Sequence, residues 1–288
     1  MSENLKIAIQ KKGRLNTKSM QLLKSCGIEI ENFQDRLFVS ASNFNLDVLF
    51  LRDDDIPEYV QDNVAHIGIV GENEMLEKGL DVEPIKKLGF GKCSLMMGVP
   101  EKDELQNIGD LENKTIATSY PNILNNYLKE KKINAKVIEL SGSVEIAPSL
   151  GVADYICDLV SSGNTLKLNK LKKSFNIIDS QAVLIKSKKL DENPKLKMIF
   201  DKLMMRIDSS LKAKKSKYIM MNVPKSSLEL IIEIIPSLES PTVLPLSNKG
   251  LVAVHAVIKE DKFWDINEDL KAAGASGILS MPIENIIL

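Results

Sequence analysis

Short apolar runs alternate with amphipathic stretches over the first two thirds of this chain. Short apolar runs are typical of strands buried on both faces, and the stretches between them carry helix signals. Pro57 fits a first helical turn near Asp55, and Gly27 fits the end of a helix that starts at Asn16 or Thr17. The first predicted strands are Lys6–Ile9, Leu46–Leu51 and His66–Val70. This alternation predicts an α/β fold with a parallel or mixed sheet.

A second set of alternating elements begins near Lys92. Its predicted strands are Ser94–Val99, Thr115–Thr118, Val137–Leu140 and Tyr155–Cys157, and its predicted helices are Pro121–Lys131, Ser143–Leu150 and Asn164–Leu171. Ala182–Ile185 is one more predicted strand, which we expect to return to the first sheet. A chain that crosses twice between two lobes leaves a cleft between them, and ligands favour such clefts.

The pattern changes after a long helical stretch at Pro194–Lys214. From Lys217 the order is strand, helix, strand, strand, helix, strand, which is the ferredoxin-like unit. No catalytic cluster is visible in this unit, so we interpret it as regulatory or oligomerising rather than as a second active site. The predicted domains are a first lobe (residues 1–92 and 181–212), a second lobe (93–180) and a C-terminal domain (213–288).

Composition narrows the class of protein. The 288 residues carry a formal charge of −1, which argues against a general nucleic-acid binder. The N-terminus has no export signal, and no apolar run reaches about 18 residues, so neither secretion nor a membrane span is expected. Three widely spaced cysteines without a CxxC pair favour reduced thiols in the cytoplasm over disulfides or a zinc site.

The segment Glu145–Leu166 carries the clearest candidate chemistry. An apolar strand ends on Asp158, and a turn of hydroxyl residues with Gly163 leads into a helix. Such a turn offers backbone N–H groups to an anion, and glycine lets the backbone approach it closely. Asp158 is placed to accept hydrogen bonds from sugar hydroxyls. The same pattern is also typical of an ordinary helix cap, and it is not a Walker A loop because no Gly-Lys-Ser/Thr follows.

This segment also resembles a family signature. The residues at the family's spacing are Glu145, Gly151, Ile156, Asp158, Ser162, Gly163, Thr165 and Leu166. Further similar segments are residues 7–15, 52–57, 68–73, 117–121, 216–221 and 240–242, so the resemblance covers essentially the whole chain. On these residues the chain resembles the long form of ATP phosphoribosyltransferase.

The resemblance implies a fold and a reaction. The fold would be two lobes like those of type II periplasmic binding proteins, followed by an ACT-like domain of ferredoxin-like order. The enzyme would transfer the phosphoribosyl group of phosphoribosyl pyrophosphate to N1 of ATP and release pyrophosphate, which is the first step of histidine biosynthesis. It would require Mg²⁺, would be inhibited by histidine, and would form homo-oligomers, with dimers and hexamers that interconvert.

Matching positions imply the site of the phosphoribosyl donor. The residues that would bind phosphoribosyl pyrophosphate are Asp154, Asp158, Ser161, Ser162, Gly163, Asn164, Thr165 and Leu166. The turn would hold the 5′-phosphate, and the two aspartates would face the ribose hydroxyls or a magnesium-bound water. The plainer alternative for Asp158 is that it only caps the turn.

Matching positions also imply the ATP site, which would lie mainly in the first lobe. Its residues would be Lys11, Arg14, Arg52, Asp53, Gly71, Glu72 and Tyr120. We regard Lys11, Arg14 and Asp158 as the catalytic residues, because the cations can pair with phosphate oxygens and the reaction requires no protein nucleophile.

Each residue of the ATP site also has a plain structural interpretation. The cations fit solvated surface charges, Gly71 fits an ordinary turn, and Tyr120 fits a half-buried ring. The carboxylates of Asp53–Asp55 suit Mg²⁺, but Asp55 also fits a helix N-cap. The metal ligands therefore stay unassigned.

For inhibition by histidine, the matching positions are Asn222, Leu238, Thr242 and Gly277. The resemblance places them at the junction between paired C-terminal domains. Each of the four also fits a strand end or a turn.

Two other functions stay open at this point. A two-lobed fold with a cleft suits a solute-binding protein or a ligand sensor equally well. The missing export signal argues against a periplasmic binder, though not against a cytosolic sensor. The other alternative is a catalytically silent regulatory subunit, and the intact Lys11, Arg14 and phosphate turn argue against it.

Overall fold

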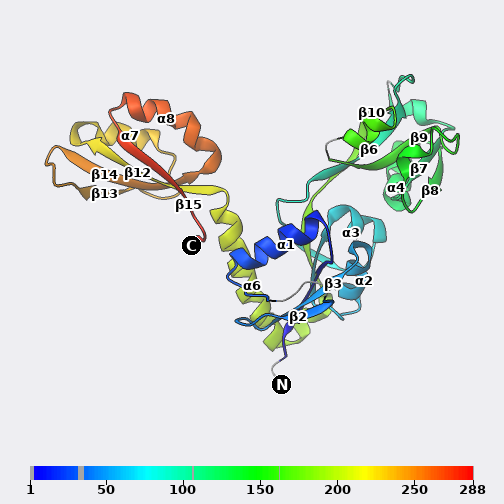
Figure 1. Cartoon of the computed structure of the whole chain (residues 1–288), viewed down its shortest axis with the longest axis horizontal. Coiled ribbons are helices and arrows are strands. Elements are labelled where there is room, and N and C mark those ends of the chain that lie inside the picture. Colours follow the sequence, from blue (N-terminus) through cyan, green and yellow to red (C-terminus); the bar gives the residue numbers. More distant parts are fainter. Residues whose placement is uncertain (1–2, 32–35, 106, 162, 288) are drawn as a thin grey trace. The chain divides into compact units, whose positions relative to one another are not determined.

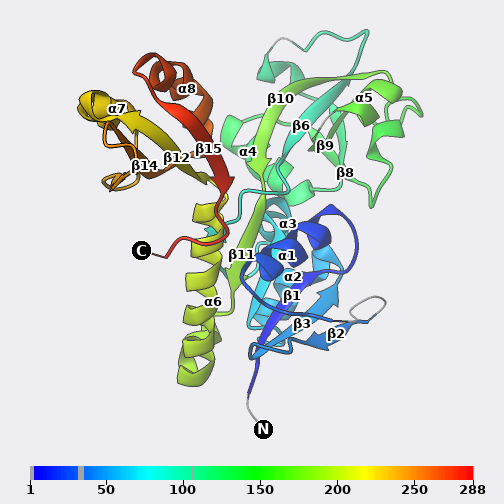
Figure 2. The ribbon, with the colours of Figure 1, turned by 60° about the vertical axis from the view of Figure 1, so that its left-hand side comes forward.

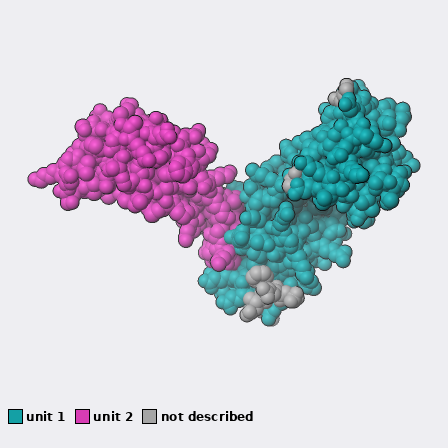
Figure 3. All heavy atoms as spheres, turned by 45° about the horizontal axis from the view of Figure 1, so that its top comes forward, with its two compact units in different colours: residues 1–21, 29–199 teal, residues 22–28, 200–288 magenta. Residues whose placement is uncertain are grey.

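The structure is a computed structural model of the chain, and it describes residues 3–31, 36–105, 107–161 and 163–287. The chain forms two compact units, a larger one of residues 1–21 and 29–199 and a smaller one of residues 22–28 and 200–288 (Figure 3). Figure 1 labels the helices and strands along the chain. The larger unit contains two sheets, one for each predicted lobe, and the smaller unit contains the third sheet.

The first sheet has six strands in the order β2-β3-β1-β4-β11-β5. Strands β3 and β4 run parallel to β1, whereas β11 runs antiparallel to β4 and β5. The bounds are β1 Leu5–Gln10, β2 Phe38–Ser40, β3 Leu46–Leu51, β4 Ile67–Gly71, β5 Glu83–Lys87 and β11 Ala182–Lys186. The predicted return of the chain to the first sheet is confirmed by β11, while β2 and β5 are strands that the pattern does not predict.

Helices in the larger unit follow the strands of this sheet. They are most of α1 (Arg14–Ser25), the 3-10 turn η1 Asp53–Asp55, α2 Ile56–Gln61 and α3 Glu72–Lys78. α2 packs closely on β4, since a Cβ added at Gly68 would lie 2.7 Å from Cγ2 of Ile56. Because β1, β3 and β4 are parallel neighbours, the residues at their carboxyl ends, Lys11, Arg52 and Gly71, share one edge of the sheet. Open α/β sheets bind ligands at such an edge.

The second sheet has five strands in the order β10-β6-β9-β7-β8. Its lobe contains β6 Cys93–Pro100, η2 Ile108–Leu111, β7 Thr115–Thr118, α4 Pro121–Lys131, β8 Lys136–Glu139, η3 Val144–Ile146, β9 Tyr155–Val160, α5 Asn164–Leu168 and β10 Leu171–Ser180. β10 leads directly into β11, with only Gln181 between them (Figure 2).

Three details of the second lobe differ from the prediction. The predicted helix at Ser143–Leu150 is a short 3-10 turn followed by hydrogen-bonded turns. β9 continues past Asp158 to Val160, so the aspartate lies inside the strand. β10 is a long strand with several exposed charged residues, and this polarity hides it from a search for apolar runs.

The smaller unit contains most of α6 (Pro194–Ala213), which follows η4 (Lys188–Glu192), and a four-stranded antiparallel sheet in the order β13-β14-β12-β15. The elements after α6 are β12 Ser216–Pro224, η5 Lys225–Ser227, α7 Leu228–Ile234, β13 Thr242–Pro245, β14 Leu251–Lys259, η6 Glu260–Lys262, α8 Phe263–Ala272 and β15 Ser276–Pro282. This is the ferredoxin-like order, so the predicted α/β fold with two lobes and an ACT-like domain is confirmed. In the part of the chain that the structure describes, no helix is both long and apolar enough to cross a membrane.

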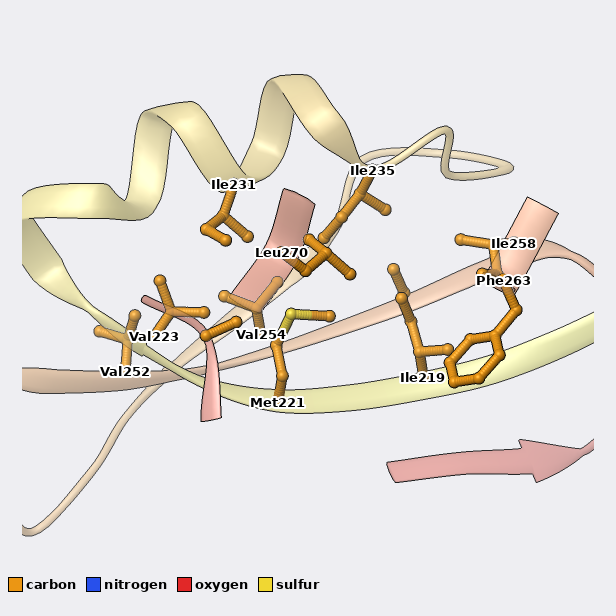
Figure 4. Packing of buried hydrophobic residues seen from close by; sticks show 12 residues of the cluster. Ile219, Met221, Val223, Ile231, Ile235, Val252, Val254, Ile258, Phe263 and Leu270 are labelled. Atoms are coloured by element: carbon orange, nitrogen blue, oxygen red, sulfur yellow. The ribbon is translucent and has the colours of Figure 1, made fainter. Parts of the chain in front are cut away.

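One face of the third sheet packs under its helices. Alternate residues of β12, namely Ile219, Met221 and Val223, are fully buried. Their side chains point toward Ile231 of α7 and Leu270 of α8 (Figure 4). Because side chains alternate along a strand, the residues between them point to the other face, where they are half-buried.

Candidate active site

The predicted phosphate turn joins β9 to α5. Ser161 is exposed and α5 begins at Asn164, while Ser162 lies outside the described residues. Gly163 has a φ of +83°, a conformation that residues with a Cβ rarely adopt. The conformation of the turn therefore requires glycine at this position.

Leu166 anchors the turn to the second lobe. Its side chain is buried in a cluster with Ile156 and Val160 of β9, whereas Asn164 and Thr165 are exposed. The turn thus combines a fixed apolar base with polar side chains on the surface.

Lys173 of β10 is a residue that the sequence analysis misses. A Cβ added at Gly163 would lie 2.3 Å from Cε and 2.9 Å from Nζ of Lys173, so the lysine side chain crosses the face of the glycine. It brings a cation next to a turn that has none between Ser161 and Leu166. No motif reveals this neighbour, because Lys173 reaches the turn only through the fold of β10.

Asp158 is half-buried inside β9. Its Oδ1 accepts a hydrogen bond from the N–H of Leu159 at 2.7 Å. Burial raises the pKa of the Asp158 carboxyl, and the charge of Glu145 adds to the rise. The pKa of Tyr120 is raised mainly by burial, and after that by Glu74 and Asp158. The Asp158 carboxylate and the Tyr120 phenol are therefore near one another.

Asp154 does not join the turn. It directly precedes β9, so the length of that strand separates it from Ser161. Its Oδ2 accepts a hydrogen bond from the N–H of Thr115 at 2.8 Å. It also lines a cavity of about 670 Å³ together with Lys102 and Lys170. The prediction that Asp154 faces the ribose stays a prediction, and the carboxylate lies at the end of the strand away from the turn.

The carboxyl ends of β1 and β3 carry the predicted cations. Lys11 follows β1, and its N–H donates to the carbonyl of Leu51 at 2.7 Å, which ties the two strand ends together. Arg14 starts α1, Arg52 follows β3, and all three cationic residues are exposed. Within the described residues none of the three forms an ion pair, so each is available to phosphate oxygens.

Asp53 is held in an unfavourable environment at this edge. Its Oδ1 is buried without a hydrogen-bond partner. Burial, and then repulsion from Glu74 and Asp54, raises the pKa of Asp53 to about 7. Its neighbour Asp55 takes the N-cap position of α2 but makes no capping hydrogen bond. Perturbed carboxyls of this kind cluster at functional sites.

Gly71 and Glu72 form the corner between β4 and α3. A Cβ added at Gly71 would lie 2.5 Å from Oδ1 of Asn73, so local packing accounts for this glycine. Oε1 of Glu72 pairs with Nζ of Lys87 at 2.9 Å. The second oxygen, Oε2, is buried without a hydrogen-bond partner and is left to a ligand.

Tyr120 connects the two lobes. Its hydroxyl donates a hydrogen bond to Oε1 of Glu74 on α3 at 3.0 Å. Burial raises the pKa of Glu74, and after burial Glu74 is the largest contribution to the raised pKa of Asp53. Glu74 and Tyr120 are in direct contact across the lobes, Glu74 acts on Asp53 through its charge, and Asp158 acts on Tyr120 in the same way. We call these four residues the acidic cluster. Glu74 is a further member that no sequence motif indicates.

The first lobe offers limited metal chemistry. Among the described residues, no three His, Cys, Asp or Glu side chains are arranged to hold a metal ion. The unpartnered oxygens of Asp53 and Glu72 nevertheless suit a hard cation. Mg²⁺ keeps several waters and is commonly bound by one or two carboxylates together with substrate phosphates. These residues therefore fit a magnesium ion that a substrate also binds.

The residues predicted to bind histidine lie at two places in the smaller unit. Leu238 and Thr242 line a pocket of about 390 Å³. Asn222 and Gly277 lie side by side on β12 and β15, where a Cβ added at Gly277 would be 3.3 Å from Nδ2 of Asn222. The pocket of one chain therefore contains only part of the predicted set.

The pocket in the smaller unit has a polar pair that the sequence analysis does not include. The hydroxyl of Tyr218 and Nδ1 of His255 lie 2.6 Å apart and share a hydrogen bond. Both residues line the pocket beside Thr242. They come from β12 and β14, whose pairing cannot be read from either strand alone.

Comparison with known proteins identifies the family of this chain. Residues 52–209 match the family model "ATP phosphoribosyltransferase", and residues 213–285 match the model "HisG, C-terminal domain". A relative from Cytophaga hutchinsonii named ATP phosphoribosyltransferase is 50% identical over 287 residues, covering 100% of both chains. Another of that name from Bacteroides thetaiotaomicron is 45% identical over 284 residues, covering 99% of this chain and 100% of the relative.

A solved structure is similar over the larger part of the chain. It is the ATP phosphoribosyl transferase (HisG:HisZ) complex from Thermotoga maritima, with a TM-score of 0.60 and 28% identity. The match covers 71% of this chain and 98% of that chain. With two family models and full-length relatives in agreement, this chain belongs to the ATP phosphoribosyltransferase family.

Proposed function

We infer that this chain transfers the phosphoribosyl group of phosphoribosyl pyrophosphate to N1 of ATP and releases pyrophosphate, the first step of histidine biosynthesis. The observation that carries this conclusion is the family match over residues 52–209. That range contains the acidic cluster and the turn around Gly163. In this proposal ATP, the acceptor, and phosphoribosyl pyrophosphate, the donor, would meet at these two parts of the larger unit.

The chemistry is a displacement at the anomeric carbon of the donor. The bond from that carbon to a pyrophosphate oxygen breaks, the bond to N1 of adenine forms, and the configuration inverts. No protein side chain forms a covalent bond. The chain contributes by aligning two polyanions and by stabilising the charge that develops on the departing pyrophosphate.

The turn after β9 would bind the 5′-phosphate of the donor. Ser161, Asn164 and Thr165 supply polar side chains there, and Gly163 supplies the positive φ that the turn requires. The sequence adds the hydroxyl of Ser162. Leu166 contributes as the anchor of the turn rather than as a contact. Asp158 would accept hydrogen bonds from the ribose hydroxyls, and the predicted role of Asp154 toward the ribose or a magnesium-bound water stays a prediction.

The edge of the first sheet would bind ATP and the leaving pyrophosphate. Lys11, Arg14 and Arg52 are exposed cations at or near the ends of β1 and β3, where they would pair with phosphate oxygens. Tyr120 would contact the nucleotide from the second lobe. At the corner before α3, Gly71 would let ATP approach the backbone closely. The packing of Asn73 against this position is by itself a reason for glycine here.

Magnesium would be held at Asp53 and Glu72 together with substrate oxygens. When bound, Mg²⁺ neutralises charge on the pyrophosphate and so assists its departure. The raised pKa of Asp53, about 7, would fall on binding the cation, because a nearby positive charge favours the ionised carboxylate.

Regulation and assembly extend the proposal. Histidine would inhibit the enzyme by binding at Asn222, Leu238, Thr242 and Gly277. Because these residues lie at two places in one chain, pairing of two C-terminal domains would complete the site, in keeping with homo-oligomers such as dimers and hexamers. The similar Thermotoga maritima protein is itself part of a complex. All three cysteines are free, which suits a reducing cytoplasm.

The test is direct. Purified protein is mixed with ATP, phosphoribosyl pyrophosphate and MgCl₂, and pyrophosphate release and the ultraviolet absorbance of the N1-substituted adenine nucleotide are followed together. Both signals should rise in equal amounts and stop when either substrate is omitted. Fresh protein that yields neither product at several ionic strengths would exclude this function.

A further inference from the structure

Glu77 is a buried carboxylate with partners in the other lobe. It lies on α3 of the first lobe and is 9% exposed. Its Oε1 accepts the backbone N–H of Asn122 at 2.8 Å, and its Oε2 accepts the backbone N–H of Ile123 at 3.0 Å. The backbone carbonyl of Glu77 also accepts a hydrogen bond from Nδ2 of Asn122 at 3.0 Å. We call Glu77, Asn122 and Ile123 the interlobe clasp.

The clasp replaces a cap that α4 lacks. The first N–H groups of a helix have no partner within the helix, and a Ser, Thr, Asp or Asn at the N-cap commonly satisfies them. α4 has Tyr120 at its N-cap without a capping side-chain bond, and its first turn contains no acid. Glu77 supplies from the first lobe both the acceptors and the negative charge that a helix N-terminus favours.

α3 is itself fixed in place next to the clasp. The N–H of Asn73 donates to the hydroxyl of Ser180 at 3.1 Å, and that hydroxyl donates back to Oδ1 of Asn73 at 2.8 Å. Ser180 ends β10, just before the chain returns to the first sheet. The next residue of α3, Glu74, accepts a hydrogen bond from the hydroxyl of Tyr120. The residues of α3 thus hold both the backbone after Tyr120 and its side chain.

We propose that Glu77 is a positioning residue that sets Tyr120 and the acidic cluster for ATP. The clasp fixes where α4 begins, the start of α4 fixes the backbone of Tyr120, and the Tyr120 ring reaches Glu74 only from that position. The proposal rests on the proposed function, in which Tyr120 contacts the nucleotide. Glu77 does not itself touch substrate, so its loss should act on the use of ATP rather than on the donor turn after β9.

The test compares Glu77→Gln with matched controls. Glutamine keeps the size of the side chain, but its amide can accept only one of the two N–H groups and presents N–H groups of its own to the other. Glu58→Gln removes an exposed carboxylate from α2. Leu128→Val removes a methylene from the buried face of α4 and so destabilises the same helix without touching the clasp.

Kinetics should separate the two substrates. Glu77→Gln should lower kcat/KM for ATP at least about tenfold, since small displacements of a positioned group are costly to catalysis. The KM for phosphoribosyl pyrophosphate should change less than about threefold on the same grounds. Glu77→Asp should recover part of the loss, and both controls should stay near the wild type. If Glu77→Gln behaves like Leu128→Val for both substrates, the positioning role is excluded.

Hydrogen exchange provides a readout that does not depend on turnover. The amides of Asn122 and Ile123 should exchange slowly in the wild type and in Glu58→Gln, and much faster in Glu77→Gln. If the wild type forms no product from ATP and phosphoribosyl pyrophosphate, the proposed function fails, and Glu77 then has no ATP to position. If the wild type is active but these amides are equally protected in Glu77→Gln, the clasp is refuted and the proposed function stands.

Discussion

The larger and the smaller unit differ in whether their buried polar side-chain atoms all have hydrogen-bond partners. Among the described residues, the buried side-chain oxygens without a hydrogen-bond partner belong to Asp53, Asn63 and Glu72, and all three lie in the larger unit. The described part of the smaller unit has none, and its core is an apolar sheet face under two helices. Folding alone disfavours a buried carboxylate oxygen without a partner. The larger unit therefore holds the buried polar atoms that folding leaves without partners, whereas the core of the smaller unit consists of apolar packing.

The largest expected effect tests the packed unit. Ile219→Ala removes a fully buried side chain from the core shown in Figure 4 and should cost about 3 kcal/mol of unfolding free energy. Urea unfolding followed by circular dichroism measures it. Met220→Ala, on the half-buried face of the same strand, is the control and should cost clearly less. Equal costs for the two variants would show that the alternation along β12 does not define the core.

Asp53→Asn should raise the free energy of unfolding, whereas Ile219→Ala lowers it. The pKa of Asp53 rises from 3.8 in the unfolded chain to about 7 in the folded chain. Between these values the folded state binds more protons, so stability falls as pH rises from about 4 to about 7. Because the variant lacks this loss, it should be clearly more stable than the wild type at pH 8 and equal to it at pH 4.

The Asp53 prediction is checked by urea unfolding at both pH values. Glu58→Gln, which changes an exposed carboxylate of α2, is the control and should leave the pH dependence unchanged. Activity of Asp53→Asn should fall while stability rises, as is common when a functional group is removed. An identical pH dependence in wild type and Asp53→Asn would show that the carboxyl is not perturbed.

A smaller effect is expected at the glycine turn. Gly163→Ala meets both the cost of a positive φ, about 1 to 2 kcal/mol, and the side chain of Lys173. Gly151→Ala is the matched control, since Gly151 has a φ of +68° with nothing within 4 Å of the added Cβ. The difference in melting temperature between the two variants measures the overlap with Lys173. Adding Lys173→Ala to Gly163→Ala should remove that difference, and a double variant as unstable as Gly163→Ala would contradict the contact.

The smallest effect concerns the polar pair of the smaller unit. Tyr218→Phe removes the hydrogen bond to His255 and should cost about 1 kcal/mol or less of unfolding free energy, because the residues are only half-buried. Tyr59→Phe, at an exposed tyrosine of α2, should be neutral. A cost above that of Gly163→Ala would mean that the smaller unit depends on buried polar contacts more than its core suggests.

Most strands could be predicted from the sequence because central strands are buried and therefore apolar. The missed strands, β2, β5 and β10, all lie at the edges of their sheets. Edge strands are exposed along one side and carry charges that discourage pairing with other chains, as in Glu83–Lys87 and at Lys172 and Lys173. Their pattern is weak for a physical reason, and only the hydrogen bonds of the sheet reveal them.

The residues of the candidate site also fall into those that the sequence predicts and those that only the fold reveals. The glycine turn could be predicted because its conformation depends on residues adjacent in sequence. Glu74 and Glu77 could not, since their partners are in the other lobe and no local spacing records that contact. Asp154 and Asp158 are close in sequence, but the extended strand carries them to different surroundings, and a local pattern cannot tell which end of the strand faces the substrate.

The passage from β10 into β11 has a mechanical consequence. The N–H of Leu88, on the outward crossing between the lobes, donates to the carbonyl of Ala182 on the return crossing, and the N–H of Ala182 donates to the carbonyl of Phe90. Two crossing segments placed far apart would restrict rotation of one lobe against the other. Two crossing segments that are hydrogen-bonded to each other would instead act as a single hinge. Any opening of the larger unit would then turn about this short line, and it would first have to break the hydrogen bonds between α3 and the start of α4.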